Sequence, residues 1–253
     1  MSNSSSTVIR KTVELAFLQP LQLLKVGAPG LGLTAFGIYV LFIPLLSAGT
    51  GQVSVGLWSI TPGLILALLG YLTFALFWHR SALLDSEQRQ AVMRISARHV
   101  GLMILSSTTL ALITIVLVLT VLLGLFLVAS VLVATDAPYF PLVEQGLSFI
   151  ASLMVGWIVC RNSLIVPAAA LSKRMTTSES WRATADQSAS ILIVLIAGVA
   201  LNAAVMYGVE RFVPLQPVFL VSVQIALTCL QMVVAVSFIS ALYQQQIIAG
   251  QSA

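Results

Sequence analysis

The residues that could do chemistry in this sequence are two arginines and four amides, each inside or at the end of a long apolar run: Arg80, Arg161, Asn162, Asn202, Gln224 and Gln231. A guanidinium group binds phosphate and carboxylate oxygens, whereas a side-chain amide both donates and accepts hydrogen bonds. These six residues are therefore the candidates for contact with a lipid headgroup or a solute.

The two arginines each allow two interpretations. Arg161, followed by Asn162, lies one to two turns inside its apolar run. It could hold an anionic headgroup or a substrate phosphate, or it could extend its guanidinium to the membrane interface, which costs little near the end of a span. Arg80 is either a positive charge that sets the membrane topology, or it forms one rim of an anionic lipid site whose other rim is Arg161.

The amides form a stripe on the last apolar run. Gln224, Thr228 and Gln231 recur at positions i, i+4 and i+7, and Asn202 lies midway along the preceding run. Such groups are costly when they face lipid, so we expect them to point inward. They either line a polar path or join helices through interhelical hydrogen bonds.

Catalytic and metal-binding patterns are missing from the sequence. His79 and His99 are the only histidines and are 20 residues apart, and no paired cysteines or carboxylate cluster completes a metal site. Cys160 and Cys229 lie inside apolar runs, where cysteine behaves as a small hydrophobic residue. We predict a protein that is not an enzyme and binds no cofactor or metal.

The composition identifies the setting of these residues. Hydrophobic residues make up 59% of the 253 positions and charged residues only 8%, whereas soluble domains carry about 25% charged residues. The mean hydropathy is +1.05. The sequence therefore predicts an all-α, polytopic transmembrane helical bundle that forms a single membrane domain over residues 1–253.

Six apolar runs are long enough to cross a bilayer, which needs about 20 residues of helix. They cover 31–48, 60–78, 101–125, 147–166, 190–208 and 218–241. In the third run, apolar residues continue to about Ala134. We interpret 101–134 as one long, tilted helix that leaves the bilayer at its far end or bends near Gly124.

Charge placement predicts the orientation. With six spans and a cytoplasmic N-terminus, ten of the twelve basic residues fall in or beside cytoplasmic segments. Arg161 then lies near a cytoplasmic span end, and only Arg211 lies outside. The outer loops hold Asp136, Glu144 and Glu210 instead. This asymmetry favours cytoplasmic N- and C-termini. The net charge of +4 then points to anionic headgroups and not to nucleic acid.

Three amphipathic stretches each lead into a span: Val8–Lys25, which Pro20 interrupts, Ser86–His99, and Thr177–Ser190. Thr176 and Glu179 fit a capping box at the start of the third stretch. We expect all three to be helices on the cytoplasmic membrane surface, with arginines near anionic headgroups.

The chain can accordingly be divided into three similar units, 7–80, 81–161 and 170–243. Trp78–Leu84 closes the first, and Val159–Ile165 closes the second at a spacing of 81 residues. This is either a three-fold repeat or a consequence of regular helix lengths.

Small residues are frequent in the fifth run, where they would allow a neighbouring helix to approach closely, within the chain or from another subunit. They are Ala197, Gly198, Ala200, Ala203 and Ala204.

Several short motifs resemble a known group. They are Trp78-His-Arg80-x-x-Leu-Leu84, Arg161-Asn-Ser-Leu-Ile-Val-Pro167, Ser178-Glu-Ser-Trp-Arg182 and Asp186-x-Ser188. Over about the middle two-thirds, the chain resembles an uncharacterised family of bacterial six-span inner-membrane proteins, loosely similar to the membrane domain attached to some glycerophosphoryl diester phosphodiesterases. The resemblance implies a location in the bacterial inner membrane. No soluble phosphodiesterase domain follows, so that activity is not carried over.

Two functions are consistent with these features. The first is a non-catalytic accessory, assembly or scaffold component of a membrane complex, with another membrane protein as its partner. The second is a transporter or lipid-handling protein, in which the two arginines and four amides line a polar intramembrane cavity.

Overall fold

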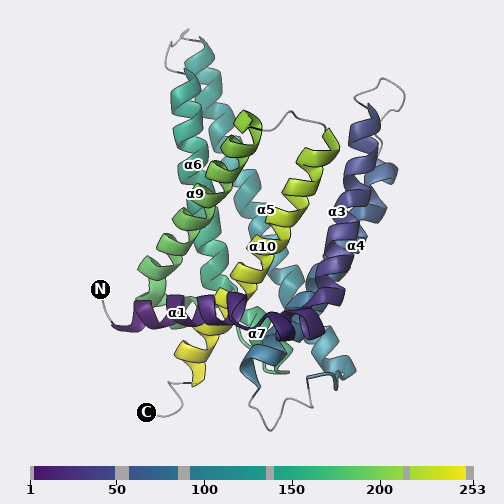
Figure 1. Ribbon diagram of the computed structural model, residues 1–253. Coiled ribbons are helices and arrows are strands. Elements are labelled where there is room, and N and C mark those ends of the chain that lie inside the picture. Colours follow the sequence, from purple (N-terminus) through teal and green to yellow (C-terminus); the bar gives the residue numbers. More distant parts are fainter. Residues whose placement is uncertain (1–2, 49–56, 85–91, 135–139, 213–216, 249–253) are drawn as a thin grey trace.

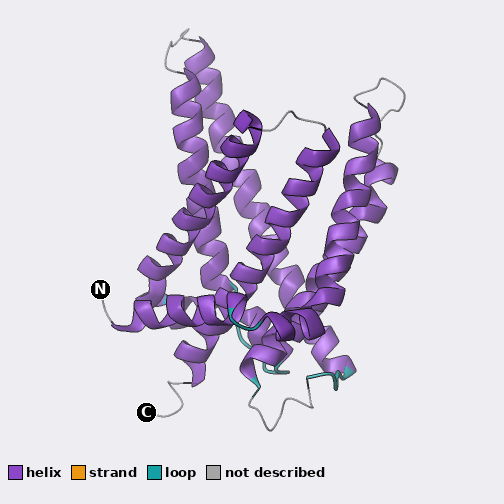
Figure 2. Cartoon of the chain, viewed as in Figure 1, coloured by secondary structure: helices purple, strands orange, loops and turns teal. Residues whose placement is uncertain are grey.

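The computed structural model describes residues 3–48, 57–84, 92–134, 140–212 and 217–248. Helices account for nearly all of this part of the chain, which contains no strand (Figure 2). The described loops gather at one end of the molecule, beside α1 (Asn3–Phe17).

Within the described residues, six helices are long and apolar enough to span a membrane, which confirms the predicted fold class and number of spans. They are α3 (Ala28–Ala48), α4 (Leu57–Leu83), α5 (Ala97–Ala134), α6 (Phe140–Asn162), α9 (Ser188–Phe212) and α10 (Pro217–Tyr243). α5 runs without interruption through Gly124 and its 38 residues extend over about 57 Å. The interpretation of 101–134 as one long helix is therefore confirmed.

We call the end of the bundle that carries the short elements the packed end. Here α1 lies across the spans, and both described chain ends lie nearby (Figure 1). The other short elements are α2 (Pro20–Gln22), the π-helical turn η1 (Leu23–Gly27), α7 (Ile165–Ala170), α8 (Thr177–Ala183), the 3-10 turn η3 (Ala185–Gln187) and the π-helical turn η4 (Gln244–Ile248).

The first and third predicted surface helices are present. α1 ends at Phe17, before Pro20 begins the next helical segment, and η1 continues directly into α3. α8 begins at a complete capping box, in which Thr176 and Glu179 each bond to the other's backbone. It ends at Ala183, earlier than predicted, so the surface helix and α9 are separate elements.

The second predicted surface helix is wrong over residues 92–96, and only its last three residues, 97–99, are helical, as the first residues of α5. Residues 86–91 lie outside the described residues, and 92–96 form a turn and irregular chain before α5 begins at Ala97. Two physical causes act on this segment. The Arg80 guanidinium binds the carbonyls of Val92 and Arg94, and the Ser96 hydroxyl lies 2.7 Å from His99 Nδ1 at the start of α5.

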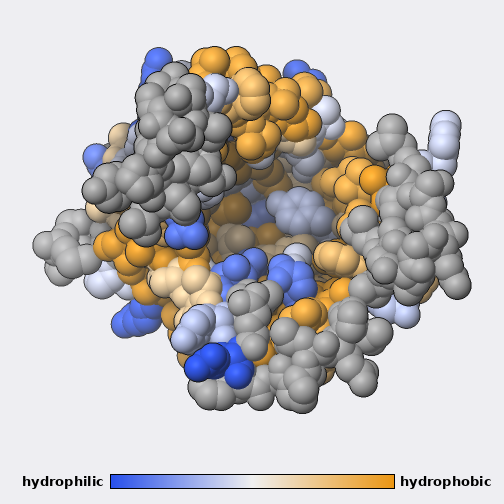
Figure 3. Space-filling model, turned by 90° about the horizontal axis from the view of Figure 1, so that it is seen from above, coloured by the Kyte–Doolittle hydropathy of each residue, from blue (hydrophilic) through white to orange (hydrophobic). Residues whose placement is uncertain are grey.

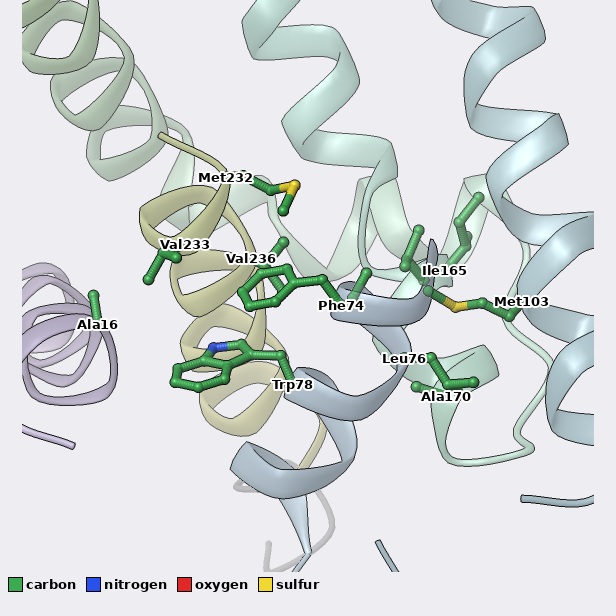
Figure 4. Close-up of a cluster of buried hydrophobic side chains, with 12 residues drawn as sticks. Ala16, Phe74, Leu76, Trp78, Met103, Ile165, Ala170, Met232, Val233 and Val236 are labelled. Atoms are coloured by element: carbon green, nitrogen blue, oxygen red, sulfur yellow. The ribbon is translucent and has the colours of Figure 1, made fainter. Parts of the chain in front are cut away.

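The core is concentrated at the packed end. Phe74 and Trp78 of α4 stack with ring centroids 5.7 Å apart, and they face Val236 of α10 (Figure 4). Ala16 brings α1 into the same cluster, and Ile165 brings in α7. Seen from the opposite end, the molecule is hollowed at its centre (Figure 3).

The closest helix pair is α3 and α4, where glycines bring the two backbones together. A Cβ atom on Gly37 would overlap the backbone nitrogen of Ala67. One on Gly70 would likewise overlap the backbone of Thr34. Small residues permit such close approach in membranes. In the fifth span, by contrast, a Cβ atom on Gly198 would meet nothing within 4 Å, so this glycine brings no neighbour of the chain close.

The last two spans diverge. α10 packs mainly on α1, α3 and α4, whereas α9 packs mainly on α6. The two helices contact each other much less than α3 contacts α4 or α5 contacts α6. The three-fold repeat stays a prediction.

Candidate functional site

Arg80 is buried near the end of α4, with 4% of its surface exposed. Its Nε donates to the carbonyl of Val92 (3.1 Å), Nη1 to that of Ala170 (3.0 Å) and Nη2 to that of Arg94 (3.2 Å). Ala170 is the last residue of α7, where helix carbonyls lack partners within the helix. One guanidinium therefore ties together α4, the end of α7 and the chain that leads into α5.

Arg161, near the end of α6, is buried as well. Its guanidinium carbon lies 3.8 Å from the ring centroid of Trp181 and 5.0 Å from that of Trp157. Nη2 donates to the Trp181 carbonyl (2.6 Å) and Nε to the Thr184 hydroxyl (3.3 Å). This arginine holds α8 against α6 through charge-assisted bonds and cation–π contacts.

The start of α8 is fixed by its own capping box. The Thr176 backbone N–H and hydroxyl donate to Glu179 Oε2 at 2.7 and 3.0 Å. These two bonds, the backbone bond foremost, lower the pKa of Glu179 below its ordinary value of 4.5. The box thus orients the helix that presents Trp181 to Arg161.

Asn162 bonds within its own helix. Its Nδ2 donates to the Ile158 carbonyl at 2.8 Å, and its side chain is buried. Arg80 bonds to α7 and to the chain before α5, whereas Arg161 bonds to α8 and to Thr184. The pairing of the two arginines as two rims of one lipid site stays a prediction. Half of the predicted site residues are thus engaged separately at the packed end.

The other half come together in one groove of about 480 Å³ between the facing sides of α9 and α10. Asn202, Gln224 and Gln231 line it, and Phe17 at the end of α1 borders it. Its other lining residues are apolar, and no charged side chain is among them.

The groove amides are only partly satisfied. Gln231 Nε2 donates to Asn202 Oδ1 at 3.1 Å, an interhelical bond of the kind that was one of the two alternatives left open by the sequence. This bond leaves Asn202 Nδ2 and Gln231 Oε1 without a partner among the described residues. The side chain of Gln224 makes no hydrogen bond within that same part of the chain. A polar group without a partner is expensive in the hydrocarbon region.

Sequence reasoning missed the hydroxyls that join α4 to α10. Trp78 Nε1 donates to the Ser237 hydroxyl at 2.9 Å, and His79 Nδ1 lies 2.8 Å from the Ser240 hydroxyl. All four side chains are buried. One signal in the sequence could have indicated this contact. Ser237 and Ser240 are three residues apart and so share a face of the sixth span, and Trp78 and His79 are adjacent aromatic residues near the end of the second span.

No metal centre is formed within the described ranges, where no three His, Cys, Asp or Glu side chains lie close enough to share an ion. Cys160 and Cys229 are free thiols.

Comparison of the chain with protein-family models, with curated proteins and with solved structures found no match. The resemblance to the six-span inner-membrane family stays a prediction.

Proposed function

We propose that this chain is a non-catalytic accessory or assembly component of a membrane complex, and that it binds another membrane protein at the groove between α9 and α10. The observation that carries the proposal is the set of incompletely bonded amides in that groove. Amides left open inside a membrane span are stabilised by a partner that brings its own donors and acceptors.

The state of the two arginines supports this function over transport or lipid handling. A pathway for phosphate-bearing headgroups needs cationic groups that are free to meet the headgroup. Arg80 donates to three backbone carbonyls, and Arg161 lies against two tryptophan rings. The groove itself has no charged lining residue.

A transporter or lipid-handling protein is the second candidate. It is favoured by the central hollow at the end opposite α1 and by the amides in the groove (Figure 3). In this function the groove would hold a lipid or solute, so the identity of the bound molecule separates the two candidates.

We further propose the bacterial inner membrane as the location, with the packed end and both termini in the cytoplasm. Basic residues support this orientation. Arg211, at the far end of α9, is the one described basic residue placed away from the packed end. Cytoplasmic segments of inner-membrane proteins carry such an excess of Lys and Arg. A reporter fused after Ala253 tests it, because a periplasmic reporter signal would reverse the orientation.

Photo-crosslinking in native membranes tests the proposed function. A photoreactive amino acid at Gly198 faces open space in the groove, because a Cβ atom there meets nothing within 4 Å. Gly32 on α3 is equally unobstructed and serves as the matched control. We expect one reproducible protein adduct from position 198 that is missing from position 32. Lipid adducts alone at position 198 would support the second candidate.

A further inference from the structure

The depth of the groove amides limits what can satisfy them. Gln231 lies 14 residues after Pro217 and 12 before Tyr243, so it is near the middle of α10. These separations correspond to about 21 and 18 Å of helix. Phospholipid headgroups occupy the two interfaces of a hydrocarbon core about 30 Å thick. A lipid acyl chain can reach the amides but has no donor or acceptor for them.

The polar atoms of the groove that lack hydrogen-bond partners among the described residues lie at two depths along α10. One set of polar atoms, on Asn202 and Gln231, lies at mid-depth. The second, the Gln224 amide, lies seven residues away, which is two helical turns or about 10 Å toward the Pro217 end. A ligand that meets both sets needs polar groups at the same spacing, which side chains at i and i+7 of a helix provide.

The shape of the groove also suits a helix. Its volume of about 480 Å³ is close to that of one turn of a helix about 10 Å wide. A full span therefore cannot be enclosed, and a helix would lie along the opening and insert side chains. Gly198 leaves room for this approach, since nothing in the chain contacts the position of its Cβ.

We infer that the groove between α9 and α10 recognises a transmembrane helix of another protein that carries an amide or hydroxyl side chain near the middle of its span. This inference rests on the proposed function, because it names the class of partner for the same groove. Asn202 and Gln231 supply the polar recognition, and the apolar sides of α9 and α10 supply the packing surface.

The experiment compares crosslink yield from position 198 in the otherwise unchanged chain and in Asn202→Leu/Gln231→Leu. An interhelical hydrogen bond contributes about 0.6–2 kcal/mol, so losing two such contacts lowers the yield by about tenfold. Asn202→Gln/Gln231→Asn retains both amides and should restore most of the yield. Thr120→Val is the matched control, since that hydroxyl is bonded to the carbonyl of Val116 on α5.

The position of the crosslink on the partner decides the class of ligand. We expect it in a transmembrane segment, within one turn of an Asn, Gln, Ser or Thr. Replacing that residue with Leu should lower the yield as far as Asn202→Leu/Gln231→Leu does, and combining the changes should add little. A crosslink in a soluble region, to a lipid or to a second copy of this chain would overturn the inference.

Failure of the inference is distinguishable from failure of the proposed function. If a protein partner is captured at position 198 and the crosslink yield is the same in Asn202→Leu/Gln231→Leu, the polar recognition is wrong and the accessory function stands. If the unchanged chain yields no protein adduct at position 198, both are wrong. Gel filtration of each variant in mild detergent verifies that it is folded and monodisperse.

Discussion

Arg80 at the packed end and the Asn202–Gln231 pair in the groove are polar groups in similarly apolar surroundings. Arg80 is buried and bonds three carbonyls from two separate segments. The amide pair makes one bond between its two members and leaves further donors and acceptors open toward the groove. The comparison teaches that polarity inside this bundle has two uses. At the packed end it holds the chain together, and between α9 and α10 it is available to another molecule.

Replacing Arg80 tests the first half of this comparison with the largest expected effect. Arg80→Met leaves three carbonyls without their charged donor, and such bonds contribute about 1.5–3 kcal/mol each. We expect the free energy of unfolding, measured by SDS titration in mixed micelles, to fall by about 3 kcal/mol or more. Arg10→Met, on the exposed side of α1, is the control. Equal stability of the two variants would contradict the structural role of Arg80.

Glycine substitutions compare the closest helix pair with the groove. Gly37→Ala forces α3 and α4 apart, so we expect unfolding to become easier by about 1–3 kcal/mol. Gly198→Ala has free space and removes a flexible residue from a helix, so stability should hold or rise by up to about 1 kcal/mol. The same SDS titration measures both. A loss at Gly198 that matches the loss at Gly37 would mean that the groove is closed.

The tryptophan contact of Arg161 is expected to matter less, because the Trp181 ring is 36% exposed. Trp181→Leu removes the cation–π contact but retains the backbone carbonyl that binds Nη2. We expect a loss of about 1 kcal/mol in the free energy of unfolding. Trp181→Phe should recover part of this loss. Trp58 is almost fully exposed, so Trp58→Leu should leave the free energy of unfolding unchanged. A Leu variant as stable as the unchanged chain would show that the hydrogen bonds alone hold Arg161.

The smallest effect concerns the pH dependence of α8. Because the pKa of Glu179 is lowered in the folded protein, its carboxylate stabilises the capping box fully at pH values above 4.5, the ordinary pKa of this group. This contribution is lost as the pH falls through the lower value in the folded protein. The protection of the first α8 amides against hydrogen exchange, taken relative to the intrinsic exchange rate at each pH, should therefore fall on acidification. In Glu179→Gln this protection should depend little on pH in this range, and a pH response like that of the unchanged chain would exclude Glu179 as the cause.

Local signals in the sequence were sufficient for the spans and for much of the surface structure. Apolar run length predicted all six long helices, and the Thr176–Glu179 spacing predicted the start of α8. Amphipathic periodicity failed over 92–96, because Arg80, distant in sequence, draws two carbonyls of this segment into its own bonding. The periodicity of a segment carries no information about such a distant donor.

The candidate site was predicted in part for the same reason. The stripe on the sixth span and Asn202 on the fifth were sufficient to expect inward-pointing amides and to offer an interhelical hydrogen bond as one alternative. The groove around it was not predictable, because it arises where α9 packs on α6 and α10 packs on α1, α3 and α4. The contacts of Arg161 with Trp157 and Trp181 were likewise not predictable, because they form only after α8 folds back on α6.

The central claim is that the groove amides serve binding and not folding, and Asn202→Leu/Gln231→Leu tests both sides at once. We predict that the unfolding free energy of the isolated chain changes by no more than about 1 kcal/mol, because one interhelical bond is lost. Crosslinking at position 198 in native membranes should meanwhile fall by about tenfold. A variant that unfolds several kcal/mol more easily yet crosslinks as well as the unchanged chain would contradict the account.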